Sequence, residues 1–250
     1  MTTVISAIVI TKNEEQRIEA CLSSLQWADE IIVVDSGSTD RTRELCEQND
    51  KVKFYERPWD GFGIQKNRAL DLASGEWIFS IDADETASPE LADEILSTVK
   101  QALYDGYILK RKNFYRGQWI KHCGWWPDPI IRLFRKDKGR FNDRLVHESV
   151  EIQGLAGELQ NPIEHHSFHS VSDFIHKADS YSTLGARQMK LQNRNVTTLD
   201  ACTHALATFI KVYFLKGGIL EGRAGLLIAV SNAGGVFYRY IKCLELTNKG

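Results

Sequence analysis

The sequence predicts an α/β fold, in which a mostly parallel sheet is flanked by helices and followed by a helical C-terminal region. Strand-like and helix-like patterns alternate from Val4 to Asp82, and from Ser172 onward the apolar residues recur at helical spacing. Such alternation is typical of parallel sheets covered by helices. A chain of 250 residues is long enough for one large domain with an appendage.

The first two strand–helix units span residues 4 to about 46. Val4–Thr11 is a continuous run rich in β-branched residues, and Glu14–Leu25 has its apolar residues at helical spacing. Glu30–Asp35 (EIIVVD) predicts a second buried strand. The following SGSTDRT supplies a turn and N-cap residues for a helix that continues to about Cys46.

Three further elements extend this sheet. Val52–Glu56 and Trp77–Asp82 predict the third and fourth strands, with a helix over Ile64–Ala73 between them. Ligands of such sheets bind outside the carboxyl ends of the strands, so we expect the polar residues at those ends to converge. They are Thr11 to Glu14, Asp35, and Asp82 to Glu85.

The pattern changes twice in the rest of the chain. Gly106 to Val150 contains short strands and loops rich in Trp, Arg and Pro. Ser172–Leu191 and Ala201–Leu246 predict helices, with breaks at Gly217-Gly218 and at Gly234-Gly235. The expected domains are residues 1–170, an α/β domain, and residues 171–250, a helical region.

The composition is that of an ordinary globular protein and excludes the disordered and fibrous classes, with 43% hydrophobic and 26% charged residues. Between Lys110 and Arg144, eleven Lys or Arg residues face three Asp residues, which predicts an anionic neighbour. The five cysteines include no CxxC pair, which favours reduced thiols in a cytoplasm. The first apolar run indicates a strand rather than a signal peptide, and no run approaches the roughly 18 residues of a membrane span.

The stretch IFSIDADET places Asp82, Asp84 and Glu85 within four positions at the end of a predicted strand. Alternation of side chains along a strand would put Asp82 and Asp84 on the same side. A divalent cation between them would relieve their repulsion, and their oxygen ligands favour Mg²⁺ or Mn²⁺. A solvated acidic turn is the alternative interpretation.

Two other strand ends carry candidate nucleotide contacts. Asp35 could accept a hydrogen bond from a base N–H or a ribose hydroxyl; a helix-capping turn is the alternative, although Asp40 and the nearby serines could cap without it. Thr11, Asn13 and Glu14 occupy the first strand-to-helix turn, where such sheets contact nucleotides. Glu14 could instead be a favourable charge on the helix dipole.

Three motifs occur in order: AIVITKNEE, EIIVVDSGSTDRT and GFGIQKNRALDLASGEWIFSIDADE. In these motifs the chain resembles the family 2 glycosyltransferases, the inverting group with the GT-A fold, over roughly residues 4–170. The later segments WWPDPIIRLFR, RLVHESV, IEHHSFHS and FLKGGILEGRAG are similar to the branch that contains the lipopolysaccharide inner-core β-1,4-glucosyltransferases.

The resemblance implies a UDP-sugar donor, expected to be UDP-glucose, and a lipopolysaccharide inner-core heptose as the acceptor. Asp82 and Asp84 would bridge Mg²⁺ or Mn²⁺ to the donor diphosphate. Lys66 follows GFGIQ and could reach the phosphates, although a surface lysine on a helix is an equal alternative. The contacts around the nucleoside would come from Thr11, Asn13, Glu14 and Asp35.

An inverting transfer also needs a general base that takes the proton of the acceptor hydroxyl. Glu148, in VHES, is the expected base because the resemblance suggests an acidic residue there. Asp128, in WWPDP, is the alternative.

Other candidate ligand contacts come from cationic and aromatic residues. Arg132 and Arg135 could clamp a phosphate by bidentate hydrogen bonds. The family pattern favours His165 as a third metal ligand or a phosphate contact. Further candidates are His147 and His166, together with Trp119, Trp125 and Trp126, which could stack on sugar rings or pack under the loop.

The C-terminal helices predict a membrane contact. Apolar side chains recur at helical spacing among basic ones, and such a helix can lie on an anionic bilayer; helix packing or dimerisation is the alternative. We therefore expect a cytoplasmic protein that is peripheral on the inner face of the cytoplasmic membrane and has no nucleic-acid partner. The residues concerned are Leu206, Phe209, Ile210, Tyr213 and Phe214, among Lys211, Lys216 and Arg223.

Other functional classes fit less well. IFSIDADET also matches the hhhhDxDxT pattern of haloacid-dehalogenase-like phosphatases, but that motif normally closes the first strand, whereas here two or three strand–helix units precede it. A nicotinamide-binding enzyme would need glycines in the first turn, which is TKNEE. A non-catalytic binding module that has kept the nucleotide fold remains open.

Overall fold

The computed structural model describes residues 4–142 and 149–248. It contains two compact units. The sheet unit comprises the residues up to Lys112 together with 128–165, and the helical unit comprises 113–127 and 166–250. The helical unit thus includes a segment, 113–127, that the sequence pattern assigns to the first domain.

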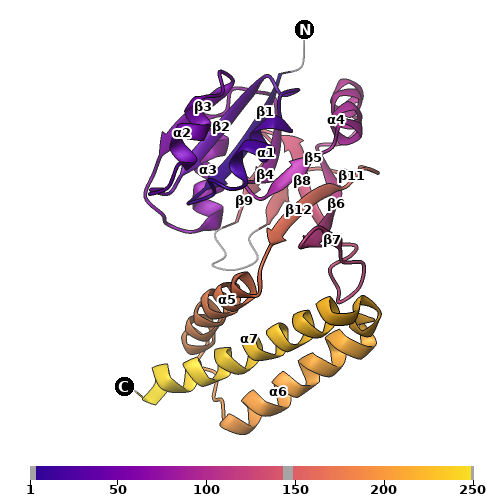
Figure 1. Ribbon diagram of the computed structural model, residues 1–250. Coiled ribbons are helices and arrows are strands. Elements are labelled where there is room, and N and C mark those ends of the chain that lie inside the picture. The colour runs from indigo at the N-terminus through magenta and orange to yellow at the C-terminus, as the bar shows by residue number, and fades with distance from the viewer. Residues whose placement is uncertain (1–3, 143–148, 249–250) are drawn as a thin grey trace. The chain divides into compact units, whose positions relative to one another are not determined.

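Four parallel strands form the first part of the sheet unit (Figure 1). They are β1 (Ile5–Thr11), β2 (Glu30–Asp35), β3 (Val52–Glu56) and β4 (Trp77–Asp82). Their order is β3-β2-β1-β4. β1, β2 and β4 are buried along almost their whole length, as expected for parallel strands that helices cover on both faces. The four strands predicted from the sequence are confirmed to within one residue.

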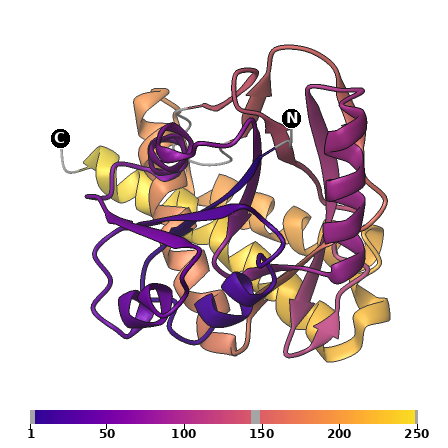
Figure 2. The same ribbon diagram turned by 90° about the horizontal axis from the view of Figure 1, so that it is seen from above.

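Helices cover both faces of these strands. They are α1 (Ile18–Ser23), α2 (Thr42–Glu47), α3 (Phe62–Leu72) and α4 (Pro89–Gln101). Figure 2 shows α3 on one side of the strands and α1 and α2 on the other. Leu70 of α3 joins a core cluster with Ile8 of β1, whereas Cys21 of α1 joins a second cluster with Val9. The alternating side chains of β1 therefore serve two separate cores.

The sheet continues beyond β4 with mostly antiparallel strands. They are β5 (Glu85–Ala87), β6 (Gly106–Tyr115), β7 (Gln118–Trp119), β8 (Pro129–Arg135), β11 (Ala156–Glu158) and β12 (Ile163–Phe168). The order runs β4-β8-β6-β12-β5, with β7 and β11 also paired to β6. A separate antiparallel pair consists of β9 (Gly139–Phe141) and β10 (Val150–Ile152). Since β8 is the direct neighbour of β4, its side chains can reach the acidic end of that strand.

Three long helices and a tight connection make up the helical unit. They are α5 (Val171–Leu191), α6 (Thr198–Ile210), η1 (Lys211–Leu215), η2 (Gly218–Glu221) and α7 (Gly222–Asn248). α5 and α6 both pack against α7. The predicted break at Gly217-Gly218 is confirmed, but the break at Gly234-Gly235 is wrong because both glycines lie inside α7. A Cβ at Gly235 would meet Ala178 of α5 at 3.8 Å, so small residues here permit close helix packing.

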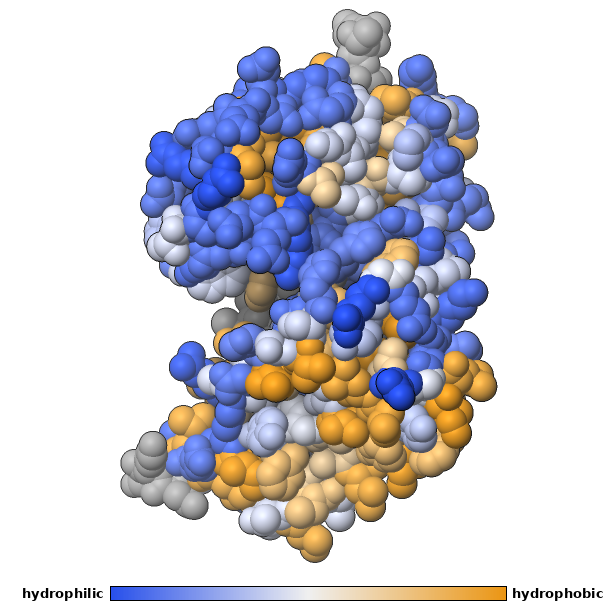
Figure 3. All heavy atoms as spheres, in the orientation of Figure 1, coloured by the Kyte–Doolittle hydropathy of each residue, from blue (hydrophilic) through white to orange (hydrophobic). Residues whose placement is uncertain are grey.

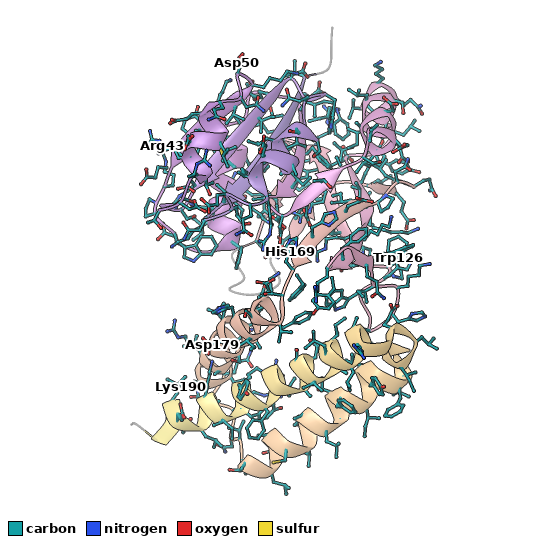
Figure 4. The ribbon with its side chains drawn as sticks, viewed as in Figure 1. Arg43, Asp50, Trp126, His169, Asp179 and Lys190 are labelled. Atoms are coloured by element: carbon teal, nitrogen blue, oxygen red, sulfur yellow. The ribbon has the colours of Figure 1, made fainter. Side chains whose placement is uncertain are left out.

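Polar contacts also join α5 to the C-terminal part of α7. Lys242 Nζ of α7 lies 2.6 Å from Asp179 Oδ1 of α5, and Lys190 Nζ donates to the Leu246 carbonyl at 2.7 Å; Asp179 and Lys190 are labelled in Figure 4. Over the described ranges, none of the helices has both the length and the apolar character needed to cross a bilayer.

Candidate active site

The carboxyl ends of β1, β2 and β4 lie level with one another. Thr11 pairs with Asp35 across β1 and β2, and Ile10 pairs with Asp82 across β1 and β4. The convergence predicted for these strand ends is therefore confirmed. The register alone brings a threonine and two aspartates to one edge of the sheet.

Asp35 closes the turn that follows β2. One carboxylate oxygen accepts from the backbone N–H groups of Gly37 (2.8 Å) and Ser38 (2.7 Å), and the other accepts from Ser38 Oγ at 2.5 Å. These contacts close a turn over residues 35–38 and do not cap a helix, because α2 begins at Thr42. Asp40, as expected, is the acidic residue that accepts from Thr42 N and Oγ1 there. An ionised carboxylate has about four acceptor positions, so Asp35 retains capacity for a further donor.

Thr11 carries an unsatisfied polar group beside Asp35. The residue is 5% exposed, and its hydroxyl has no hydrogen-bond partner among the described residues. A buried hydroxyl without a partner costs free energy that a paired one does not. A ligand that bonds to this hydroxyl would recover that free energy.

Asn13 and Glu14 connect the loop after β1 to the loop after β2. Asn13 has a φ of 55°, and its side-chain carbonyl accepts from Thr39 N at 2.8 Å. Glu14 N donates to Thr42 Oγ1 at 2.8 Å, while the Glu14 carboxylate pairs with Arg17 at 2.9 Å. These contacts delay the start of α1 to Ile18, four residues after the predicted Glu14. In this structure both residues thus hold together the loops that follow β1 and β2.

Asp82 is bound by two cations. Lys66 Nζ lies 2.9 Å from Oδ1, and the Arg132 guanidinium binds Oδ2. Burial alone would raise the pKa of Asp82, but Arg132 and Lys66 outweigh it and hold the pKa well below its usual range. Lys66 is 3% exposed, so the surface-lysine alternative is wrong. It is a buried lysine at the acidic end of β4.

Glu85, one of the three carboxylates of the IFSIDADET stretch, is the centre of this ion-pair network, a role that the sequence pattern did not indicate. It is fully buried, and its carboxylate binds Arg132 at 2.8 and 2.9 Å and Arg111 at 3.3 Å. It also accepts the backbone N–H of Asp82 at 2.9 Å. Glu85 therefore fixes the turn between β4 and β5. Residues 83 and 84 lie in this turn, so the strand alternation assumed for Asp82 and Asp84 does not apply.

The predicted phosphate clamp is wrong. Arg132 is 1% exposed and is shared by Asp82 and Glu85. Arg135 pairs with Glu76 at 2.9 Å. Buried carboxylates need cationic partners, and the sequence could not indicate that Arg132 serves that role.

The structure describes only one of the two candidate bases. Glu148, like His147, lies outside the described residues. Asp128 Oδ2 accepts from Arg111 Nε at 2.8 Å and Nη2 at 2.7 Å. Both bonds end on the same oxygen, so Arg111 engages one of the two carboxylate oxygens of Asp128.

Asp84 faces a histidine. His165 Nε2 of β12 lies 3.2 Å from Asp84 Oδ2, and both side chains are mostly buried. His166, in the helical unit, stacks on Phe114 with ring centroids 4.6 Å apart, which is a packing role. Among the three histidine candidates, His165 is thus the one that the structure places beside the acidic turn.

The residues present fit a divalent ion with few protein ligands. Carboxylate and imidazole groups can both bind such an ion, and Mg²⁺ commonly takes one or two protein ligands plus phosphate oxygens and water. Across the described residues, no three His, Cys, Asp or Glu side chains form a ready-made cage. Asp84 and His165 lie together at the acidic turn and have the right chemistry, whereas Asp82, expected as a ligand, is engaged by Lys66 and Arg132.

The three tryptophans predicted to stack or pack, Trp119, Trp125 and Trp126, belong to the helical unit. Trp125 stacks on Phe168 and Phe174, with centroids 5.2 and 6.2 Å apart. Trp119 and Trp126 meet edge to face at 5.2 Å, and Trp126 is labelled in Figure 4. Packing, one of the two alternatives predicted for these residues, accounts for all three.

Comparison with known proteins gives one consistent family. The profile of glycosyl transferase family 2 matches residues 6–166. The lipopolysaccharide core biosynthesis glycosyltransferase LpsC of Rhizobium meliloti is 30% identical over 94% of this chain and 93% of its own length. An uncharacterized glycosyltransferase of Rickettsia typhi is 31% identical over 98% of this chain and 88% of its own.

Solved structures share the fold. S. aureus TarS 1–349, crystallised with UDP-GlcNAc, has a TM-score of 0.52 and 16% identity, covering 99% of this chain and 92% of that chain. The predicted α/β fold of GT-A type with a helical C-terminal region is confirmed. The haloacid-dehalogenase-like alternative is wrong, because the DADET motif closes the fourth strand of the chain within the family 2 match.

Proposed function

Because the chain belongs to glycosyl transferase family 2, we propose that it transfers a hexose, with inversion, from a UDP-sugar to the inner core of lipopolysaccharide. The observation that carries this proposal is the level alignment of Thr11, Asp35 and Asp82 at one sheet edge. Asp84 and His165 lie beside each other at the turn that follows. The name of the LpsC relative supports the choice of acceptor.

The donor nucleoside would bind over β1 and β2. The unpaired Thr11 hydroxyl and the remaining acceptor capacity of Asp35 suit a base N–H or a ribose hydroxyl. Asn13 and Glu14 would hold the surrounding loops in place through Thr39 and Thr42. UDP-glucose is the proposed donor, in keeping with the branch that the sequence resembles.

The diphosphate would lie near the acidic turn. Asp84 and His165 would hold Mg²⁺ or Mn²⁺, with Asp82 close by, and the bound ion would stabilise the negative charge of the departing UDP. Lys66 and Arg132 compensate the charge of Asp82. That compensation lowers the repulsion which an approaching diphosphate would otherwise meet.

The acceptor hydroxyl must lose a proton as its oxygen attacks the anomeric carbon and the bond to the UDP oxygen breaks on the opposite face. We assign this proton to Glu148. The family resemblance supports this choice, because it suggests an acidic residue at that position. Asp128, the alternative base, is held by Arg111 through one of its two carboxylate oxygens.

A heptose of the inner core is the proposed acceptor, and the proposed location is the cytoplasmic face of the inner membrane, with no nucleic-acid partner. The basic run from Lys110 to Arg144 supports a phosphorylated acceptor less than expected. Several of its cations are paired with carboxylates of the fold, namely Arg111, Lys112, Arg132, Arg135 and Arg140. The acceptor proposal therefore depends mainly on the LpsC relative.

One panel of variants tests this function. Purified protein is given UDP-glucose, MnCl₂ and a core oligosaccharide that ends in heptose, and both UDP release and product mass are followed. We expect Asp84→Ala to lower turnover by about a thousandfold, roughly 4 kcal/mol of transition-state stabilisation, with an unchanged unfolding curve. Glu148→Gln should retain UDP binding by calorimetry but lose transfer.

The controls separate the parts of the proposal. EDTA should abolish the turnover and added Mn²⁺ should restore it. Full activity of Asp84→Ala would refute the metal role, and loss of transfer in Asp128→Asn but not in Glu148→Gln would reassign the base. Release of inorganic phosphate instead of UDP would refute the transferase itself.

A further inference from the structure

The connection between α6 and α7 presents large apolar side chains to solvent. We call residues 211–223, which include η1 and η2, the hairpin tip. Phe214 is 54% exposed, Leu215 79%, Ile219 52% and Leu220 71%. Soluble surfaces carry isolated apolar side chains, whereas a contiguous group marks an interaction site.

The hairpin tip is an ordered turn, so the chain holds these side chains outward in a fixed arrangement. Gly217 has a φ of 68°, which favours glycine. A Cβ at Gly225 would lie 1.8 Å from the Gly218 carbonyl oxygen, so the start of α7 packs directly on η2. Cys123 N donates to the Lys216 carbonyl at 2.8 Å, and Val212 is buried in the adjoining core.

The charges of the hairpin tip have one sign at its surface. Lys211, Lys216 and Arg223 are exposed. The carboxylate of Glu221 is 7% exposed and faces inward, where it accepts from His122 N at 3.0 Å and contacts His122 Nδ1 at 2.6 Å. Every exposed charge in the stretch 211–223 is therefore positive.

An open apolar groove also lies between α6 and α7. Its volume is about 450 Å³, and Figure 3 shows hydrophobic colouring over these two helices. Leu206, Val230 and Tyr238 are both groove-lining and exposed. The full lining is Ala205, Leu206, Phe209, Val230, Ala233, Gly234, Phe237 and Tyr238.

We propose that the hairpin tip and this groove insert into the interface of an anionic bilayer. Phe214, Leu215, Ile219 and Leu220 enter the acyl boundary, the three cations meet lipid phosphates, and the groove takes an acyl chain. Apolar residues ringed by Lys and Arg are the pattern of interfacial helices. The inference deepens the membrane location given under the proposed function and names the residues that carry it.

Charge decides between a membrane and a second copy of this chain. A symmetric dimer places the same surface patch on both subunits, so it would set Lys211, Lys216 and Arg223 against themselves. The stretch 211–223 offers no exposed carboxylate to pair with them. An anionic lipid surface supplies the missing negative charge.

A fluorescent label tests the depth of insertion. Cys202, in α6, is the exposed cysteine, and the other four cysteines are buried. An environment-sensitive fluorophore is attached to Leu215→Cys in a Cys202→Ser background. The matched control carries it on Leu191→Cys in the same background, an equally exposed leucine at the end of α5 that belongs neither to the hairpin tip nor to the groove. With phosphatidylglycerol vesicles, we expect a blue shift and quenching by doxyl lipids at position 215 but not at 191.

Sedimentation with the same vesicles tests the two kinds of side chain separately. Phe214→Ser with Leu215→Ser should lower vesicle binding at least about tenfold, while Leu199→Ser, which alters an equally exposed leucine at the other end of α6, should not. Lys211→Glu with Lys216→Glu should lower binding to phosphatidylglycerol and remove the preference for it over phosphatidylcholine.

Two outcomes would overturn this inference. One is wild-type vesicle binding by the Phe214→Ser, Leu215→Ser variant; the other is a concentration-dependent dimer that this variant abolishes, which would make a second copy the occupant. UDP release from UDP-glucose without vesicles should be unchanged in the variant. Vesicle binding by a protein that shows no transfer would instead refute the proposed function and leave the inference standing.

Discussion

At the amino edge of the parallel strands, Glu30 is satisfied by close neighbours. Ser6 Oγ donates to it at 2.5 Å, Ser74 donates through N and Oγ at 2.5 and 2.8 Å, and Lys53 Nζ lies at 2.6 Å. At the carboxyl edge, Asp82 and Glu85 share the guanidinium of Arg132. One carboxylate thus has four donor groups from three residues at one edge, whereas two carboxylates share one guanidinium at the other.

This difference separates a carboxylate that serves only the fold from carboxylates that lie where a ligand can bind. Ser6, Ser74 and Lys53 together satisfy Glu30 within the fold. At the other edge, long side chains from β8 and α3 supply the positive charge. A bound diphosphate and its metal can enter that arrangement, because the unpaired Thr11 hydroxyl and the Asp84–His165 pair lie at the same ends of the strands.

Removal of the shared guanidinium should have the largest effect on stability. Arg132→Met leaves the fully buried Glu85 and its neighbour Asp82 without their common cation. Breaking a buried pair in this way costs about 3–5 kcal/mol. Urea unfolding followed by circular dichroism measures the loss.

The control is a surface pair on the same unit. Arg140→Ala removes an exposed partner of Asp71 and should cost less than about 1 kcal/mol. Equal costs for the two variants would mean that the carboxyl-edge network is no more important to the fold than a surface contact.

Acid should weaken the amino edge by an intermediate amount. Burial opposes the charged form of Glu30, but Lys53, Ser6 and Ser74 lower its pKa from 4.5 to about 2. As the pH falls, Glu30 of the unfolded chain therefore binds a proton near pH 4.5, whereas Glu30 of the folded chain binds it only near pH 2. Up to about 3 kcal/mol of stability, present above pH 4.5, is lost as the pH falls through this window.

Glu30→Gln isolates that contribution. The variant should be less stable than wild type at pH 6, and the difference should shrink as the pH approaches 3 in parallel urea titrations. A difference that is the same at both pH values would show that the charge of Glu30 does not stabilise this edge.

The smallest effect on stability concerns Thr11. Thr11→Val removes a buried hydroxyl that has no described partner, so stability should be unchanged or rise by up to about 1 kcal/mol. UDP affinity, measured by calorimetry, should fall about fivefold because one hydrogen bond to the ligand is lost. Ser80→Ala removes another unpartnered buried hydroxyl, in the middle of β4, and should leave UDP affinity unchanged. Equal UDP affinity in the Thr11 variant and wild type would remove Thr11 from the donor site.

The strands and the common edge were predictable from the sequence, because continuous apolar runs such as Glu30–Asp35 fix a buried strand and its last residue. The level of those ends then follows from parallel pairing. The family motifs predicted a glycosyltransferase of family 2, and the family match over residues 6–166 confirms that prediction.

The long-range polar contacts were not predictable. Arg132 lies about fifty residues from Asp82 in the chain, so the sequence pattern gave no sign of their pairing. The prediction that Arg132 binds phosphate therefore missed its ion pairs with Asp82 and Glu85. Gly234 and Gly235 look like a break, yet both lie inside α7, where Gly235 faces Ala178 of α5. The base assignment to Glu148 stays a prediction, since that residue lies outside the described ranges.

The shared guanidinium of Arg132 also limits which substitutions this sequence can accept during evolution. Arg132 binds Asp82 and Glu85 with one planar group, and a lysine offers a point charge in place of that fork. Substitution at any of the three positions is penalised until the others follow, so the three are epistatic. Selection for new sugars or acceptors would therefore act first on the loops around this trio, and the trio would change last.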